Sequence, residues 1–194
     1  MEITSAQLKE LRDKTGISVM QCKKALEEAG GDMDKAVIIL KKKRSEAAEK
    51  KSDRELGSGS VGVYVHNTGE VAAMVLLGCE TDFVSKNPEF VALAKDIAMQ
   101  VAATNPTYIS KAELPEEAIQ KAKEVFAPEV EGKPEEMKEK IMEGKLSAYF
   151  REQILLEQPF IKNPDMTIGE MVTGAIQKFG ENTSIVKISR VSVK

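Results

Sequence analysis

The sequence predicts an α+β fold, and three observations lead to this fold class. Helix-start and helix-stop signals recur over residues 1–50. Runs rich in Val and Ile near 61–79 and 184–193 are typical of strands, whereas the stretch between them shows helical periodicity. Strands at both ends of a helical middle indicate an antiparallel sheet of about three strands packed by helices.

Residues 1–52 are predicted to form a small module of three short helices. The first covers about 6–14, and the second begins at Ser18, which can form a capping box with Gln21. Asp32 is placed to cap the third helix. The module contains few large apolar side chains, so its hydrophobic core can stabilise it only marginally. We therefore expect a satellite module beside a larger domain.

Residues 53–60 are predicted to be a linker, because Gly57–Ser60 has the composition of a flexible segment. The preceding basic cluster, Lys41–Arg44, has two interpretations. It contacts RNA or an acidic partner, or it is a solvated helix face. The alternating acids that follow and the net charge of −3 favour the solvated face.

Residues 61–194 are predicted to form the α+β core domain. Strands 61–66 and 70–79 flank a hairpin loop, and the second strand is apolar on both faces, so it should lie centrally and be covered. Asn87 and Pro88 begin a helix that runs to about 103.

The remainder of the core is predicted to be helical until the last strand. Residues 115–160 are divided by prolines and contain too little apolar surface for full burial, so we expect a projecting helical hairpin. A capping box at Thr167 and Glu170 opens a further helix. Residues 184–193 form the closing strand.

Thr81–Val84 is the most informative segment of the chain. It connects an apolar strand to the helix start at Asn87, so Asp82 and Phe83 are expected together on an exposed turn. One interpretation is that Phe83 covers the core and Asp82 binds backbone N–H groups of the turn. The other is that the pair inserts into another protein, because an exposed aromatic ring needs a surface against which to pack.

The chain offers little that indicates catalysis or a cofactor. It has one histidine, His66, two separated cysteines, and no phosphate-binding glycine loop or hydrolase motif. Scattered carboxylates leave an enzyme as an open alternative, but no paired-acid motif is present. We expect no metal or cofactor. No run of about 18 apolar residues and no signal segment are found, which predicts a cytoplasmic protein without membrane contact.

Three blocks of sequence resemble the bacterial elongation factor Ts family. Leu11–Gly16 with Met20–Leu26 is similar to its N-terminal signature, Cys79–Val84 to its second, and Glu157–Ile161 to a third block. The blocks occur in the family's order, and the resemblance covers essentially the whole chain.

The resemblance implies a guanine-nucleotide exchange factor for elongation factor Tu, with no direct binding of nucleic acid. The residues matching Thr81, Asp82, Phe83 and Val84 dislodge Mg²⁺ from the partner's nucleotide site, with the aromatic ring wedged between partner helices. The N-terminal module resembles a ubiquitin-associated domain and would dock on the partner's GTPase domain. The residues expected to anchor it are Leu11, Arg12, Thr15, Gly16, Val19, Met20 and Lys23. For Leu11 and Met20 the alternative is a place in the module's own core.

The chain is similar to the short form of the family, whose members are homodimers joined through their sheets. This implies a complex of two copies of each partner. The sequence has no cysteine after Cys79, so a disulfide-linked dimer is not expected. A non-catalytic adaptor that binds RNA or the ribosome through Lys41–Arg44 remains the alternative function.

Overall fold

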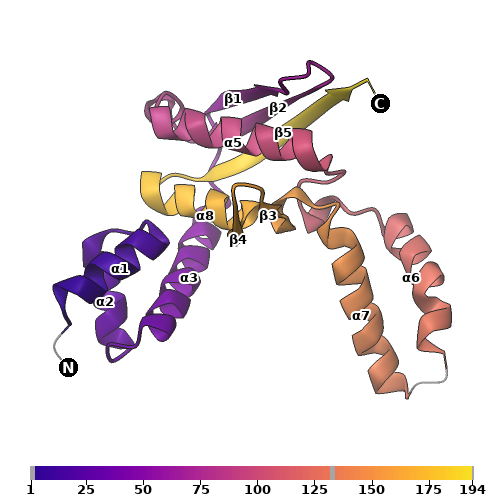
Figure 1. Ribbon diagram of the computed structural model, residues 1–194, viewed down its shortest axis with the longest axis horizontal. Helices are drawn as coiled ribbons and strands as arrows, with labels where there is room; N and C mark the ends of the chain where they lie inside the picture. Colours follow the sequence, from indigo (N-terminus) through magenta and orange to yellow (C-terminus); the bar gives the residue numbers. More distant parts are fainter. Residues whose placement is uncertain (1–2, 132–133, 194) are drawn as a thin grey trace. The chain divides into compact units, whose positions relative to one another are not determined.

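The computed structural model describes residues 3–131 and 134–193 and divides into two compact units (Figure 1). The N-terminal unit contains the chain up to Glu55 together with Thr173–Asn182, and the sheet unit contains Leu56–Val172 and the chain from Thr183 onward. The α+β class is confirmed. Among the described residues, no helix is long and apolar enough to cross a membrane.

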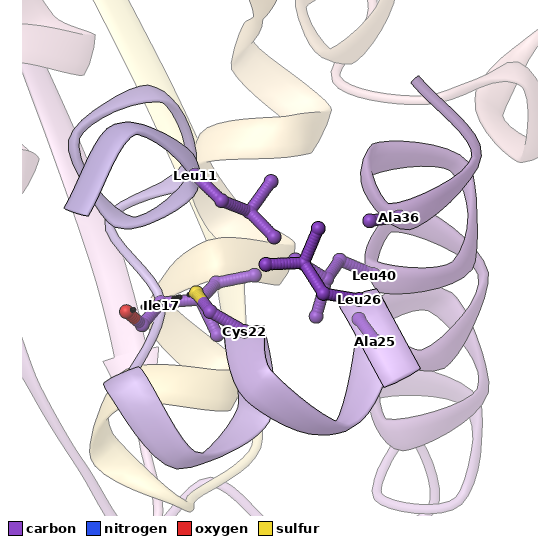
Figure 2. Packing of buried hydrophobic residues seen from close by; sticks show 7 residues of the cluster. All are labelled: Leu11, Ile17, Cys22, Ala25, Leu26, Ala36 and Leu40. Carbon is purple, nitrogen blue, oxygen red and sulfur yellow. Dashed lines mark hydrogen bonds between the residues drawn. The ribbon is translucent and has the colours of Figure 1, made fainter. Parts of the chain in front are cut away.

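Three helices form the N-terminal unit, as predicted: α1 (Ser5–Thr15), α2 (Val19–Glu28) and α3 (Met33–Glu49). The predicted caps are present, because the side chains of Ser18 and Asp32 accept hydrogen bonds from the third helical N–H of α2 and α3. Buried side chains of the three helices and of the α1–α2 connection converge on one small core (Figure 2), made of Leu11, Ile17, Cys22, Ala25, Leu26, Ala36 and Leu40.

The N-terminal unit also includes a segment that the sequence did not assign to it. Gln177 donates a hydrogen bond to the side chain of Gln21 at 3.1 Å. The side chain of Asn182 donates to the carbonyl groups of Ser52 at 3.3 Å and Arg54 at 2.8 Å. The boundary predicted at residue 52 therefore omits Thr173–Asn182, because these polar contacts between distant segments have no local sequence signal.

The sheet unit is built on three antiparallel strands in the order β1–β2–β5. They are β1 (Ser58–Val65), β2 (Val71–Cys79) and β5 (Thr183–Ser192), and β2 is central, as predicted. Helix α5 (Pro88–Thr104) packs on one face of this sheet (Figure 1). Its start is the predicted one, with Pro88 in the first turn and Asn87 accepting from the Glu89 N–H at 2.9 Å.

The predicted linker is too long, because β1 begins at Ser58 and not at Val61. Gly59 pairs with Gly78 and Ser60 with Leu77 in the antiparallel ladder. A side chain at Gly59 would lie 2.6 Å from the Leu77 carbonyl oxygen, so this position needs the absence of a Cβ atom. The glycine and serine residues here therefore belong to a closely packed strand, although their composition resembles a linker.

Helices α6 (Glu116–Val130) and α7 (Glu135–Arg151) form the predicted hairpin and run side by side (Figure 1). The sequence predicts that prolines, among them Pro128, divide this region. Instead, Pro128 lies inside α6, and α7 continues through Leu146. A small cluster that includes Ala122, Phe150 and Ile154 packs the hairpin.

The segments that complete the sheet unit are short. They are η1 (Lys111–Glu113), η2 (Leu155–Glu157), β3 (Pro159–Phe160) and β4 (Asn163–Thr167). Strands β3 and β4 pair with each other and were not predicted. Helix α8 (Ile168–Phe179) follows, and its predicted capping box is present: the Thr167 N–H donates to Glu170, and the Glu170 N–H donates to the Thr167 hydroxyl.

Candidate functional site

The segment Thr81–Val84 lies between the central strand and α5, at the end of β2. The sequence predicts a turn here, and the structure has a single helical turn, α4 (Asp82–Ser85). Thr81 precedes it in an extended conformation and is exposed. Two elements with many buried residues, β2 and α5, therefore hold both ends of a short exposed segment.

The first two side chains of α4 face solvent, and the last two are buried. Phe83 is 86% exposed, whereas Val84 and Ser85 are buried. Because Phe83 does not cover the core, the first interpretation of this residue is wrong. Val84 was expected in the partner-binding group, but its burial leaves it little surface to offer, and we assign it to anchoring the turn instead.

Asp82 has a partner that the sequence analysis did not single out. The ammonium group of Lys86 lies 2.7 Å from the Asp82 carboxylate, and both side chains are exposed. The hydrogen bond and positive charge of Lys86 lower the pKa of Asp82 from its ordinary value, so the carboxylate is ionised at neutral pH. The four-residue spacing would have revealed this pair if the segment had been expected to be helical.

The N-terminal unit presents an apolar pair at the start of α2. Val19 is 46% and Met20 is 68% exposed, next to the exposed Gly16. Leu11, by contrast, has no exposed surface and lies in the core shown in Figure 2. Of the two roles that the sequence leaves open for Leu11, its burial therefore supports packing in the core of the unit.

The remaining predicted contact residues of this unit are polar. Arg12 and Lys23 are exposed, and Lys23 lies 3.9 Å from Glu27. Thr15 is half-buried, and its hydroxyl donates to the Leu11 carbonyl oxygen at 2.6 Å. Thr15 therefore acts first as a local structural residue, and the exposed group that a partner can reach consists of Arg12, Gly16, Val19, Met20 and Lys23.

The basic cluster Lys41–Arg44 does not form a continuous free cationic surface. Lys43 is paired with Glu28. Arg44 donates to the Thr15 carbonyl oxygen at 3.1 Å and to Gln177 at 3.3 Å. Because Lys43 and Arg44 are engaged inside their own unit, the cluster gives little support to the RNA-binding alternative.

A second apolar surface is the face of the β1–β2–β5 sheet opposite α5. The strand register aligns Val61 with Leu76 and Val63 with Met74, and all four side chains are exposed. Val65 and Val191 extend the same face, since each pairs with Ala72. The sequence predicts that both faces of β2 are covered, but within the described sheet unit the second face is not.

Catalytic and metal-binding chemistry has few candidates in the part of the chain that the structure describes. No group of three or more His, Cys, Asp or Glu side chains there could hold a metal ion. The imidazole Nδ1 of His66 lies 3.0 Å from the Thr68 hydroxyl within the β1–β2 loop, which is a local turn contact. Both cysteines are buried free thiols.

The fold and this site define a class of α+β protein. The chain combines a three-helix unit with a sheet unit that carries an exposed aromatic side chain on a short helical turn. A family model described as elongation factor TS matches residues 44–194. The chain belongs to the elongation factor Ts family, and it is therefore a translation elongation factor with a role in protein biosynthesis.

Individual relatives agree with this assignment along the full sequence. The elongation factor Ts of Thermodesulfovibrio yellowstonii is 48% identical over 194 residues, which cover 100% of this chain and 97% of the relative. The proteins of the same name from Heliobacterium modesticaldum and Carboxydothermus hydrogenoformans are 47% and 48% identical over 190 residues, covering 97% of this chain and 88% of each relative. The resemblance predicted from the three sequence blocks is thereby confirmed.

Proposed function

We propose that this chain is a guanine-nucleotide exchange factor for elongation factor Tu and that α4 is the element that acts on the partner's nucleotide site. The single observation that carries the proposal is the 86% exposure of Phe83, beside an ionised carboxylate, on a turn held between buried elements. Insertion into another protein accounts for that exposure. Burial of about 150 Å² of the ring would contribute roughly 4 kcal/mol at about 25 cal/mol/Å².

The proposed mechanism is a competition between the exchange factor and the nucleotide. Mg²⁺ in the partner's site links phosphate oxygens to protein ligands, so its displacement weakens the binding of GDP. Phe83 separates partner elements near the metal, and Asp82 disturbs the metal's surroundings through its charge. The exchange factor and GDP must weaken each other's binding to the partner by the same factor. A thousandfold effect requires roughly 4 kcal/mol of coupling.

The N-terminal unit supplies affinity in this proposal. Val19 and Met20 offer exposed apolar surface, and the flexible thioether of Met20 adapts to an irregular partner surface. Arg12 and Lys23 add cationic groups at its margin. The protein changes which state of its partner is stable and makes or breaks no covalent bond, so we propose that it is not an enzyme and that it acts in the cytoplasm, where translation takes place.

The proposed function is tested by the release of fluorescently labelled GDP from elongation factor Tu in a stopped-flow instrument. We expect the intact protein to accelerate release by about two orders of magnitude or more, because the exchange factor and GDP compete through the coupling above. Added Mg²⁺ in excess should slow the reaction. If the intact protein does not accelerate release at any concentration, the proposed function is wrong.

We further propose that two copies of the chain associate through the open face of the β1–β2–β5 sheet, giving a complex with two partner molecules. Val61, Val63 and Val65 lie opposite Leu76, Met74 and Ala72, so the part of this face that β1 and β2 form is apolar. Exposed apolar surface of this kind is typical of an interface. A two-fold axis brings the same patch together from both copies.

Replacement of Val63 by Lys is expected to dissociate this dimer. The two-fold axis places two lysines in the interface, and burying unpaired charges should weaken dimerisation by about 100-fold or more. Sedimentation velocity at micromolar concentration should show a dimer for the natural sequence and a monomer for Val63→Lys. The matched control, Val125→Lys, makes the same substitution at another exposed valine, on α6, and should remain dimeric. A monomeric natural protein would rule out the sheet-mediated dimer.

A further inference from the structure

The first residues of β1 lie against α4, the turn that carries Phe83. In the strand register, Ser58 pairs with Cys79, Ser60 with Leu77, and Gly62 with Val75. Cys79, Leu77 and Val75 are buried, so the inward row of β1 begins with Ser58, Ser60 and Gly62. The period-two alternation of the strand therefore continues through the segment that resembles a linker, and it brings two hydroxyl groups to the inner face.

Both hydroxyl groups bind the last residue of α4. The Ser58 hydroxyl donates to the Ser85 hydroxyl at 2.9 Å, and the Ser85 hydroxyl donates in turn to the Asp82 carbonyl oxygen at 3.2 Å. The Ser60 hydroxyl donates to the Ser85 carbonyl oxygen. Ser85 is only 7% exposed, so these bonds are largely shielded from competing water.

A helical turn as short as α4 needs such support. Four residues are too few to form a stable helix alone, since the nucleation of helix is unfavourable. The backbone bonds within the segment run from Ser85 to Thr81 and from Lys86 to Asp82, each at 3.2 Å. Thr81, at the start of the turn, supplies no capping side-chain bond. The serine contacts therefore add side-chain restraint at the opposite end of the turn.

We propose that Ser58, Ser60 and Ser85 form a hydroxyl clamp that positions Phe83 and Asp82 for nucleotide exchange. The three serines are positioning residues, because they act through the backbone of α4 and are not expected to touch the partner's nucleotide site. This inference rests on the proposed function of α4. It also explains why a stretch of small residues occurs immediately before the apolar part of β1: they let α4 approach and hold it by hydrogen bonds.

The clamp is tested first in the free protein, without any partner, by amide hydrogen exchange measured with NMR. The amides of Lys86 and Asn87 report on α4, since they donate to the Asp82 and Val84 carbonyl groups. In Ser85→Ala and Ser60→Val we expect their exchange to accelerate about tenfold, which corresponds to the loss of one hydrogen bond in the local opening equilibrium. The amide of His66, at the other end of β1, should be unchanged.

A matched pair of variants separates the hydroxyl group from side-chain size. Threonine and valine have the same shape, but only threonine retains the donor. Ser60→Thr should therefore preserve slow exchange at Lys86 and Asn87, whereas Ser60→Val should not. If the amides of Lys86 and Asn87 still exchange slowly in both Ser60→Val and Ser85→Ala, the clamp is wrong. It is also wrong if these amides exchange as fast in Ser60→Thr as in Ser60→Val.

The second measurement is GDP release from elongation factor Tu. Ser85→Ala and Ser60→Val should lower the maximal rate about fivefold, while the concentration that gives the half-maximal rate changes less than about twofold, because α4 is loosened and the N-terminal docking surface is retained. If the variants show faster amide exchange but retain the natural maximal rate of GDP release, the positioning role is wrong. If the natural protein does not accelerate GDP release from elongation factor Tu, the proposed function is wrong. Amide exchange in the free protein then still decides whether the clamp exists.

Discussion

Replacement of Phe83 by Ala is expected to lower the maximal rate of GDP release from elongation factor Tu by about 10- to 100-fold. A large aromatic side chain at the centre of an interface commonly contributes about 2 kcal/mol or more, and each 1.4 kcal/mol changes a rate about tenfold. Because Phe83 is 86% exposed, the substitution removes little internal packing. The free energy of unfolding should change by less than about 0.5 kcal/mol.

The control for this experiment is Val125→Ala, which truncates an exposed apolar residue on α6. With this variant, elongation factor Tu should release GDP at the natural maximal rate. Both variants should keep the natural unfolding midpoint, measured by circular dichroism in urea. If Phe83→Ala and the double variant with Asp82→Ala both retain the natural rate, the role assigned to α4 is wrong.

The helices were predictable from sequence where their ends are determined by local chemistry. Ser18, Asp32 and Asn87 are caps because a short polar side chain reaches a backbone N–H two or three residues later. The capping box of Thr167 and Glu170 works in the same way. Such signals depend on a few neighbouring residues, so a single sequence contains all the information they need.

Elements that depend on distant partners were predicted poorly. The composition of Gly57–Ser60 indicates a linker, but its glycines and serines serve contacts with β2 and α4. On α5, Val91 is 45% exposed, while the neighbouring Phe90 is completely buried, and the helix pattern alone does not decide between these two apolar residues. A shift of one position rotates a helical side chain by about 100°, and only the location of the sheet decides which residue faces it.

In the candidate site, too, the features that depend on local sequence were predictable and those that depend on the surrounding structure were not. An exposed Asp82 and Phe83 follow from the expectation that connecting segments run over the surface. The inward orientation of Val84 and the pairing of Asp82 with Lys86 depend on the helical form of α4, which four residues cannot specify alone. Leu11 illustrates the opposite case, because an amphipathic helix pattern identifies an apolar position without revealing whether a core or a partner covers it.

Gly62→Ala is expected to cause the largest loss of stability among single methyl additions in the sheet unit. A Cβ atom at this position would lie 2.1 Å from the carbonyl oxygen and 2.2 Å from the carbonyl carbon of Ala94, and 2.6 Å from the Lys95 nitrogen. All three are backbone atoms of α5, so no rotamer change can relieve the overlap. The helix must move away from β1, and we expect a destabilisation of about 3 kcal/mol, at the upper end of the usual cost of overpacking.

Gly144→Ala provides the matched control, because it adds the same methyl group where there is space. Gly144 lies inside α7, and, apart from its chain neighbours and the backbone of its own helix, no described heavy atom lies within 4 Å of an added Cβ. Alanine is the better helix former, so this variant should be more stable by about 0.5–1 kcal/mol. Calorimetry should therefore show opposite shifts of the unfolding temperature, and a Gly62→Ala protein as stable as the natural one would contradict the close contact of β1 with α5. Because α5 begins directly after α4, displacement of this helix should also slow GDP release, an effect that Gly144→Ala should not produce.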